Sequence, residues 1–247
     1  MNDLQLRQKI QSAIQAFAHD EFQLASDRLL AAMGYASPRR LPFLDRSPEE
    51  FLQNYAKSAS FNRAKALLDD WLAVDLLFQL SGQDLAGSLP QSLPFSEDTH
   101  VDQDITSYLF FALRLKDQPY SRSQLSTLTR EINRVLRVPA MLVLSYGNRL
   151  SMAIIHRRPN KREAGKDVLE KVTLIKDIDV HRPHRAHVEI LSDLSLSNVV
   201  EKFPASSMES LHEAWQKVLD IKELNKNFYR ELSNWYFWAV RECTFPL

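Results

Sequence analysis

The chain has few glycines, and they are scattered. Among its 247 residues only five are glycine, and no two of them lie within four residues of each other. A dinucleotide-binding fingerprint and a P-loop both need clustered glycines, which let the backbone approach phosphate closely. The sequence therefore excludes both motifs and disfavours a complete nucleotide-binding or methyl-donor-binding core.

Cysteine and long apolar segments are scarce as well. The single Cys243 excludes a disulfide framework and a cysteine-based zinc site. The first ten residues lack the apolar core of a secretory signal, and no apolar run reaches the roughly 18–20 residues that span a bilayer. We therefore expect a soluble cytoplasmic protein with no membrane partner, folded as one large domain or two small ones.

The formal net charge of zero hides an uneven distribution. Residues 1–113 carry 9 basic and 15 acidic side chains, residues 114–187 carry 16 and 7, and residues 188–247 carry 6 and 9. The middle block also holds four of the seven histidines. A cationic block between acidic flanks predicts either a face for a polyanion or, alternatively, an ordinary solvated surface.

Apolar spacing predicts an α+β fold, a mixed α/β sandwich. Helical periodicity appears in residues 4–17, 21–33, 61–80, 121–137, 208–220 and 224–242, and Ser47 with Pro48 is typical of a helix start. Strand patterns occur at 107–115, 140–145, 149–156, 171–178 and 187–191. We expect a helical subdomain at 1–98, a central mixed sheet with helices at 99–195, and C-terminal helices at 196–247 that pack on this core.

The last helical segment is unusually aromatic. Trp235, Tyr236, Phe237 and Trp238 follow one another and point all around a helix, which predicts burial on several sides. We interpret these residues and Trp71 as core rather than as platforms for stacking bases. The abrupt end after this helix leads us to expect the N-terminal piece of a longer chain, with a docked terminal helix as the alternative.

One pattern resembles the metal site of a PD-(D/E)xK nuclease. Asp102 and Asp104 precede a strand that ends in Arg114, Leu115 and Lys116. Lys116 fits the motif, but an arginine stands where the second carboxylate belongs, and arginine cannot ligate a metal. Asp104 and Lys116 are thus weak catalytic candidates, and Glu131 is a substitute carboxylate from elsewhere. We assign no cofactor to the chain, and Mg²⁺ only if the nuclease is active.

Three histidines spaced three apart form the most unusual stretch. His181, His184 and His187 suggest a transition-metal site, but Pro183 breaks helical spacing and no acidic second shell is obvious nearby. We assign no metal and favour a phosphate-contacting loop, with a structured turn as the alternative. The candidate DNA-binding residues are Arg122, Arg130, Arg134, His156, Arg157, Arg158, Lys161, Arg162, Arg182, His184, Arg185 and His187.

Several segments resemble a known family. They read YSRSQL at 120–125, TREIN at 129–133, EKVTLIKDI at 170–178, PHRAH at 183–187, LNKNFY at 224–229 and NWYFWA at 234–239. Residues 60–247 thereby resemble the N-terminal region of large bacterial type IIG-like restriction–modification DNA methylases. The resemblance implies that a nuclease often occupies this region, and that the methyl-donor site and the Asn-Pro-Pro-Tyr motif lie downstream of it.

Three functional hypotheses follow from the sequence. The first is a DNA-associated N-terminal domain of a restriction–modification or phage-defence methylase, nuclease-like but not cleaving by itself. The second is a protein–protein docking module for the methylase body downstream in the same polypeptide. The third is an active Mg²⁺-dependent endonuclease domain with a nonstandard set of acids.

Overall fold

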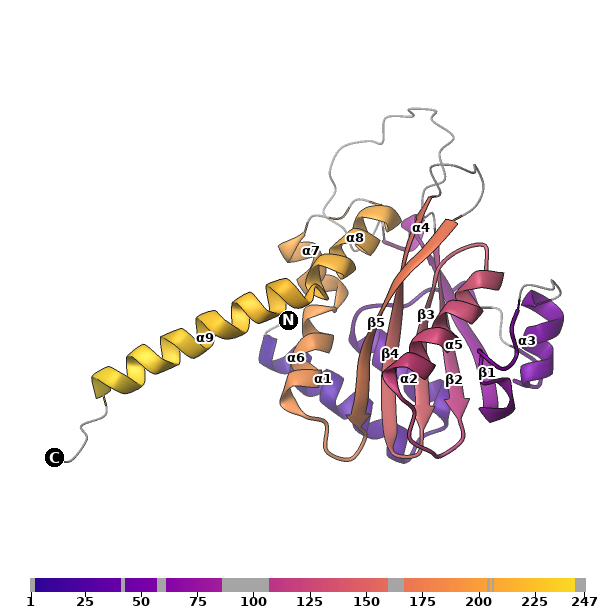
Figure 1. Cartoon of the computed structure of the whole chain (residues 1–247), viewed down its shortest axis with the longest axis horizontal. Coiled ribbons are helices and arrows are strands. Elements are labelled where there is room, and N and C mark those ends of the chain that lie inside the picture. The colour runs from indigo at the N-terminus through magenta and orange to yellow at the C-terminus, as the bar shows by residue number, and fades with distance from the viewer. Residues whose placement is uncertain are drawn as a thin grey trace, which may run out of the picture.

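A computed structural model of the chain describes residues 3–40, 43–56, 61–85, 107–159, 167–203, 205 and 207–242. Its centre is one five-stranded sheet in the order β1-β2-β3-β4-β5 (Figure 1). The strands are β1 Trp71–Ser81, β2 Ser107–Leu115, β3 Ala140–Tyr146, β4 Arg149–Pro159 and β5 Asp167–Asp179. Only β2 and β3 pair in parallel, and the other neighbours are antiparallel. The predicted α+β class is thus confirmed.

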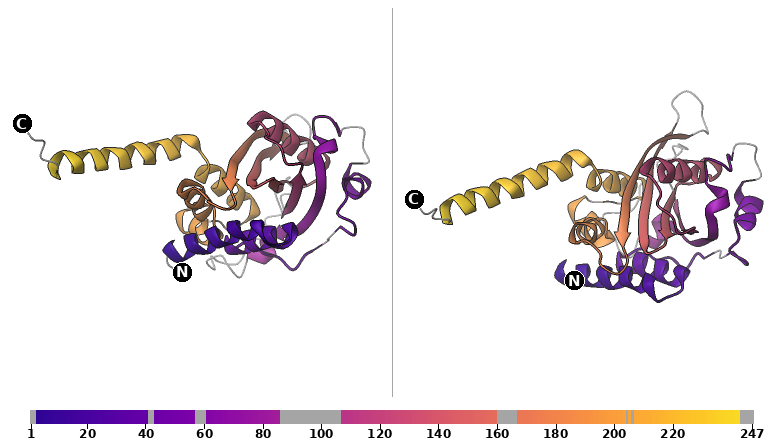
Figure 2. Two further views of the ribbon diagram at one scale, coloured as in Figure 1. Left: turned by 90° about the horizontal axis from the view of Figure 1, so that it is seen from below. Right: turned by 60° about the horizontal axis from the view of Figure 1, so that its bottom comes forward.

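Helices cover both faces of the sheet (Figures 1 and 2). One face packs against α1 Asp3–Gln15, α2 Phe22–Ala32, α6 Arg185–Asp193, α7 Leu196–Lys202 and α8 Met208–Val218. The other packs against α3 Pro48–Tyr55 and α5 Arg122–Val135. The remaining elements are the short η1 Ala16–Ala18, η2 Leu68–Asp70 and α4 Gly82–Leu85, and the long α9 Ile221–Glu242.

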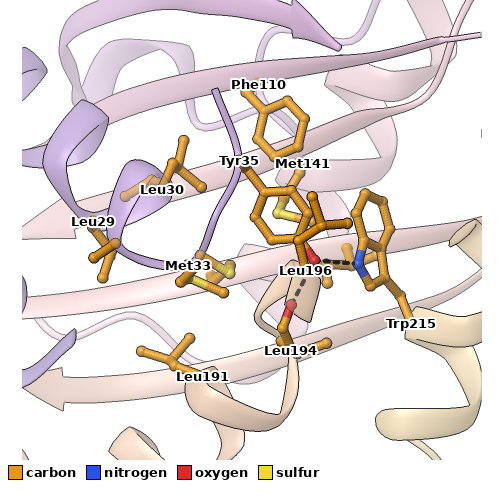
Figure 3. Packing of buried hydrophobic residues seen from close by; sticks show 14 of the residues in the cluster. Leu29, Leu30, Met33, Tyr35, Phe110, Met141, Leu191, Leu194, Leu196 and Trp215 are labelled. Atoms are coloured by element: carbon orange, nitrogen blue, oxygen red, sulfur yellow. Dashed lines mark hydrogen bonds between the residues drawn. The ribbon is translucent and has the colours of Figure 1, made fainter. Parts of the chain in front are cut away.

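The layers are joined by buried polar contacts as well as by apolar packing. In the core between α2 and α8, the hydroxyl of Tyr35 donates to the carbonyl of Leu194 at 2.5 Å and accepts from Trp215 Nε1 at 2.7 Å (Figure 3). Both rings are fully buried, and they meet edge to face. Because each polar atom is satisfied, the contact fixes the position of α8 without leaving an orphaned group.

The first half of the chain departs from the sequence prediction. The helix expected at 61–80 is wrong, since residues 71–81 form the edge strand β1, paired with β2. Val74, Leu76 and Leu77 are all buried, because this strand is covered on both faces and its apolar run is nearly continuous. Such a run cannot be told from a buried helix by periodicity alone. Leu67, in left-handed backbone at φ 54°, ends the preceding turn.

Two predictions about the second half are also wrong. The strand expected at 187–191 lies inside α6, which begins after His184, whose ring accepts a hydrogen bond from the backbone N–H of Ala186. The four consecutive aromatic residues of α9 expected to be core are not: Trp235 is 60% and Trp238 57% exposed, because α9 points away from the body (Figure 1). The burial of Trp71, the other four expected strands and the remaining expected helices are confirmed.

Candidate nucleic-acid interface

The candidate interface is built on α5, the crossover helix between the two parallel strands. Ser121 and Gln124 form a capping box: each side chain accepts the backbone N–H of the other residue. Leu125, Leu128 and Ile132 repeat at helical spacing and are buried against the sheet. The start of the helix and its orientation are therefore both fixed by the sequence, and the opposite side faces outward.

The outward side of α5 carries arginines. Arg122, Arg130 and Arg134 are exposed on the helix, and Arg137 is exposed just beyond its last turn. The one acidic residue of the helix, Glu131, is buried and accepts from Arg134 Nη1 at 3.0 Å and from the backbone N–H of Asn62 at 3.2 Å. Since this acid is turned inward, the exposed charges of α5 are all positive. We name Arg122, Arg130, Arg134 and Arg137 the α5 arginine face.

Arg157 of β4 joins this face from the sheet. Its Nη2 donates at 2.8 Å to the carbonyl of Leu136, the residue that follows α5. Cations at a helix C-terminus stabilise the helix dipole. Because Nε and Nη1 of Arg157 are buried and Nη2 binds the Leu136 carbonyl, this residue holds the end of α5 from beneath and does not present its guanidinium to solvent. Arg122 ties the other end of α5 to the sheet, because its Nη1 donates to the carbonyl of Leu174 at 3.3 Å.

Other predicted phosphate contacts lie elsewhere or outside the described structure. His156 projects from β4 on the opposite face of the sheet, into a pocket of about 430 Å³ beside α8, with Lys171, Gln216 and Lys217. Lys161 and Arg162 lie outside the described residues, and so does the side chain of Arg158. The structure thus brings together the α5 arginine face and Arg157, but not His156.

The basic stretch around residue 184 is also separate, at the start of α6 on the α1 side of the sheet. Arg182 and His184 are exposed there. Arg185 pairs at 2.7 Å with Glu189, which also binds Arg7 of α1. In this part of the structure these charges link α6 to α1.

The histidines of this stretch do not meet as a group. His184 and His187 lie with ring centroids 6.2 Å apart, whereas His181 lines a different pocket, of about 470 Å³, with His19. Burial lowers the pKa of His187, and the positive charge of His184 adds to this effect. Among the residues that the structure describes, no group of three or more His, Cys, Asp or Glu could hold a metal ion.

The nuclease-like pattern is not assembled by the described residues. Lys116 Nζ lies 3.8 Å from Asp70, and Asp104 lies outside the described residues. Glu131, the substitute carboxylate, is in the third turn of α5. Its carboxylate already binds Arg134 and the backbone N–H of Asn62. Arg114 is exposed on β2.

Sequence reasoning missed two buried ionisable groups. Asp75 of β1 lies 3.2 Å from Arg46 Nε, and burial raises its pKa to about 6 although Arg46 opposes the shift. His212 of α8 contacts the Tyr108 hydroxyl through Nδ1 at 2.5 Å, and burial lowers its pKa to about 4, with a contribution from His156. Asp75 lies in a mostly apolar strand and His212 on an amphipathic helix, and only the packing of distant elements shows that both are buried.

A third feature without a sequence signal is Asp177 in a bulge of β5. Its backbone is left-handed, at φ 60°, where the register between β4 and β5 shifts. Its Oδ1 accepts from the Tyr146 hydroxyl at 2.9 Å. Although partial burial disfavours its charged form, hydrogen bonds from Lys176 and Tyr146 hold the pKa of Asp177 below its ordinary value. The aspartate thus anchors the bulge next to the end of β3.

Comparisons with known proteins give a family but no function. No curated protein and no solved structure matches the chain. No helix among the described residues combines the length and apolar character that a membrane span requires. Residues 95–236, more than half of the chain and a range that includes α5 and β2 to β5, match the family described as "Domain of unknown function (DUF4391)". The chain therefore belongs to the DUF4391 family.

Proposed function

We propose that the chain is a DNA-contacting domain of a restriction–modification or phage-defence system, and that the α5 arginine face carries the contact, with Arg157 holding the end of α5 in place. The observation that supports this proposal best is the charge of α5: four arginines lie on or just beyond its outer side, and its one acid is buried. The link to a methylase rests on the resemblance of residues 60–247 to the N-terminal region of type IIG-like enzymes.

The dimensions of the face suit a phosphate backbone. From Arg122 to Arg134 the helix axis rises about 18 Å at 1.5 Å per residue. A DNA strand advances 3.4 Å per phosphate, so this length spans about five phosphates of one strand. Guanidinium groups bind phosphate oxygens through paired N–H donors. Contacts of this kind position a protein on DNA without reading its sequence.

Cleavage is not part of this proposal. Lys116 pairs with Asp70, and the carboxylate of Glu131 is held by Arg134 and the Asn62 backbone. A nuclease of the expected type needs at least two carboxylates beside the lysine to hold Mg²⁺ and position water, and the pair with Asp70 supplies one. We therefore propose binding without cleavage by this chain itself, and keep the Mg²⁺-dependent endonuclease as an outcome of the test.

The test is a salt series of binding to a short labelled DNA duplex, with and without Mg²⁺, and with cleavage followed in the same tubes. With one phosphate neutralised by each of the four arginines of the face, the logarithm of the binding constant should fall against the logarithm of the salt concentration with a slope of about −4. Binding with this slope and intact DNA supports the proposal. No binding at low salt contradicts it, and Mg²⁺-dependent cleavage establishes the endonuclease instead.

A second candidate function is protein–protein docking, and α9 favours it. Seven large apolar side chains of this helix are exposed: Tyr229, Leu232, Trp235, Tyr236, Phe237, Trp238 and Val240. The expected partner is the methylase body of the same longer polypeptide. Co-purification of the chain with that separately produced body, lost in Trp235→Glu, supports docking; an unchanged interaction in this variant contradicts it.

A further inference from the structure

The helix α9 leaves the folded body soon after it begins. In both views of Figure 2 and in Figure 1 it points away from the sheet, and it packs against the end of α8. Trp235, Tyr236, Phe237 and Trp238 are each more than half exposed. A helix this apolar is normally buried, so the arrangement indicates a surface that is covered in the working protein.

The exposed apolar residues are not spread evenly around the helix. At 3.6 residues per turn, Tyr229, Leu232, Trp235, Tyr236 and Val240 fall within an arc of about 140°, which we name the α9 apolar arc. Of the exposed polar residues, Arg230, Asn234 and Arg241 lie on the opposite side, and Ser233 and Glu242 flank the two ends of the arc. An apolar stripe wider than about 100° on a helix with a polar back is typical of packing against another element.

The area of the arc matches the need of a small symmetric dimer. Aromatic side chains bury about 150–250 Å² each, and Tyr229, Trp235 and Tyr236 are 66%, 60% and 58% exposed. With Leu232 and Val240 the arc offers roughly 500 Å² per copy, or about 1,000 Å² for two copies. That total is at the threshold of a specific interface. Phe237 lies about 60° beyond one end of the arc and Trp238 about 60° beyond the other. Both would add contact area at the edge of the interface.

We propose that the α9 apolar arc pairs with the same arc of a second copy of this chain, around a two-fold axis. The inference rests on the part of the second candidate function in which α9 is a docking surface, and it places a second copy of the chain on that surface instead of the methylase body. A two-fold interface uses the same patch on both subunits, so one apolar arc is sufficient to build it. The formal net charge of zero means that two copies approach without net repulsion.

Sedimentation equilibrium of the whole chain over the micromolar range tests the proposal, with a reducing agent present because of Cys243. The wild type is expected to show a reversible monomer–dimer equilibrium. Trp235→Glu with Tyr236→Glu removes the dimer, and Trp235→Ala with Tyr236→Ala, which favours the helix, raises the dissociation constant at least tenfold. The matched control Asn234→Glu, on the opposite side of α9, leaves the dissociation constant of the dimer unchanged.

Two results overturn self-pairing: a wild type that stays monomeric at the highest concentration, or a dimer that persists in both arc variants. The failure of the broader docking function is recognised separately. A monomer that binds the methylase body through Trp235 overturns self-pairing and leaves docking intact. A monomer that also fails to bind that body overturns both.

Discussion

Glu131 and Arg134, one turn apart on α5, form an ion pair between a buried carboxylate and an exposed guanidinium. The side chain of Glu131 is 2% exposed and that of Arg134 is 44% exposed, with 2.9 Å between Oε1 and Nη1. The same carboxylate accepts the Asn62 backbone N–H. This relationship turns the only acid of α5 inward, and it leaves the outer side of the helix positive.

Removing the charge of Glu131 separates its structural role from the charge of the face. We predict that Glu131→Gln lowers the free energy of unfolding by about 1–3 kcal/mol, because a buried acceptor loses its charge-assisted bonds. DNA affinity is expected to stay equal or to increase, since an acid is lost near the arginines. Urea denaturation and duplex binding measure the two effects. Arg134→Gln leaves the same buried carboxylate without its cation, so it is expected to cost at least about 1 kcal/mol as well; a stability unchanged in this variant would contradict the ion pair.

Asp75 is predicted to weaken the fold as pH rises. Burial raises its pKa to about 6, so the folded state favours the protonated acid relative to the unfolded chain. Its contribution to stability is complete below about pH 4 and is lost as pH rises through about 6. Asp75→Asn, which is neutral throughout, should remove this decline, a change of about 3 kcal/mol across the window. Denaturation at a series of pH values checks this prediction, and an unchanged slope in the variant contradicts it.

His212 is predicted to act in the opposite direction within the same pH window. Burial lowers its pKa to about 4, so the folded state favours the neutral ring. Its contribution is present above about pH 6.5 and is lost as pH falls through about 4. His212→Gln should therefore remove a loss of stability on the acid side. In the wild type the effects of Asp75 and His212 on stability partly cancel between about pH 4 and 6. A plot of the free energy of unfolding against pH should therefore rise in Asp75→Asn and fall in His212→Gln. Slopes of the same sign in the two variants would contradict the two pKa assignments.

The hydroxyl of Tyr35 is predicted to contribute strongly to the core between α2 and α8. Tyr35→Phe leaves the indole N–H of Trp215 without its acceptor and the carbonyl of Leu194 without this donor. An unsatisfied buried polar group costs about 1–3 kcal/mol. The loss in free energy of unfolding should be at least 1 kcal/mol by urea denaturation. Tyr236→Phe, at a residue 58% exposed, is the matched control and should change stability little; equal losses in both variants would contradict the assignment.

Much of the fold was predictable because local patterns agree with the tertiary environment. Residues 107–115, 121–137 and 140–145 have the spacing of a buried strand, an amphipathic helix and a second buried strand, and they form β2, α5 and β3. The strand β1 was not predictable, because an apolar run covered on both faces has no period of two. The helix α6 was missed because Pro183 and the histidines before it suggested a turn leading into a strand.

The candidate interface was predictable only in part. The helical spacing of Arg130 and Arg134 placed them on one face, and the structure keeps them there. The burial of Glu131 and the reach of Arg157 to Leu136 depend on contacts between distant segments, which spacing does not contain. The exposure of Trp235 and Trp238 was mispredicted, because composition shows that a helix needs a partner but not whether the partner lies in the same chain.

The measurement that tests the central claim most directly is duplex DNA binding at one fixed low salt concentration by two charge-matched double variants. Arg130→Glu with Arg137→Glu reverses two charges of the α5 arginine face. Lys9→Glu with Arg241→Glu makes the same change in net charge at exposed positions on α1 and α9. The account predicts at least a tenfold loss of affinity in the first variant and less than a threefold loss in the second. Equal losses in the two variants would contradict it, because attraction by overall charge alone would then explain the binding.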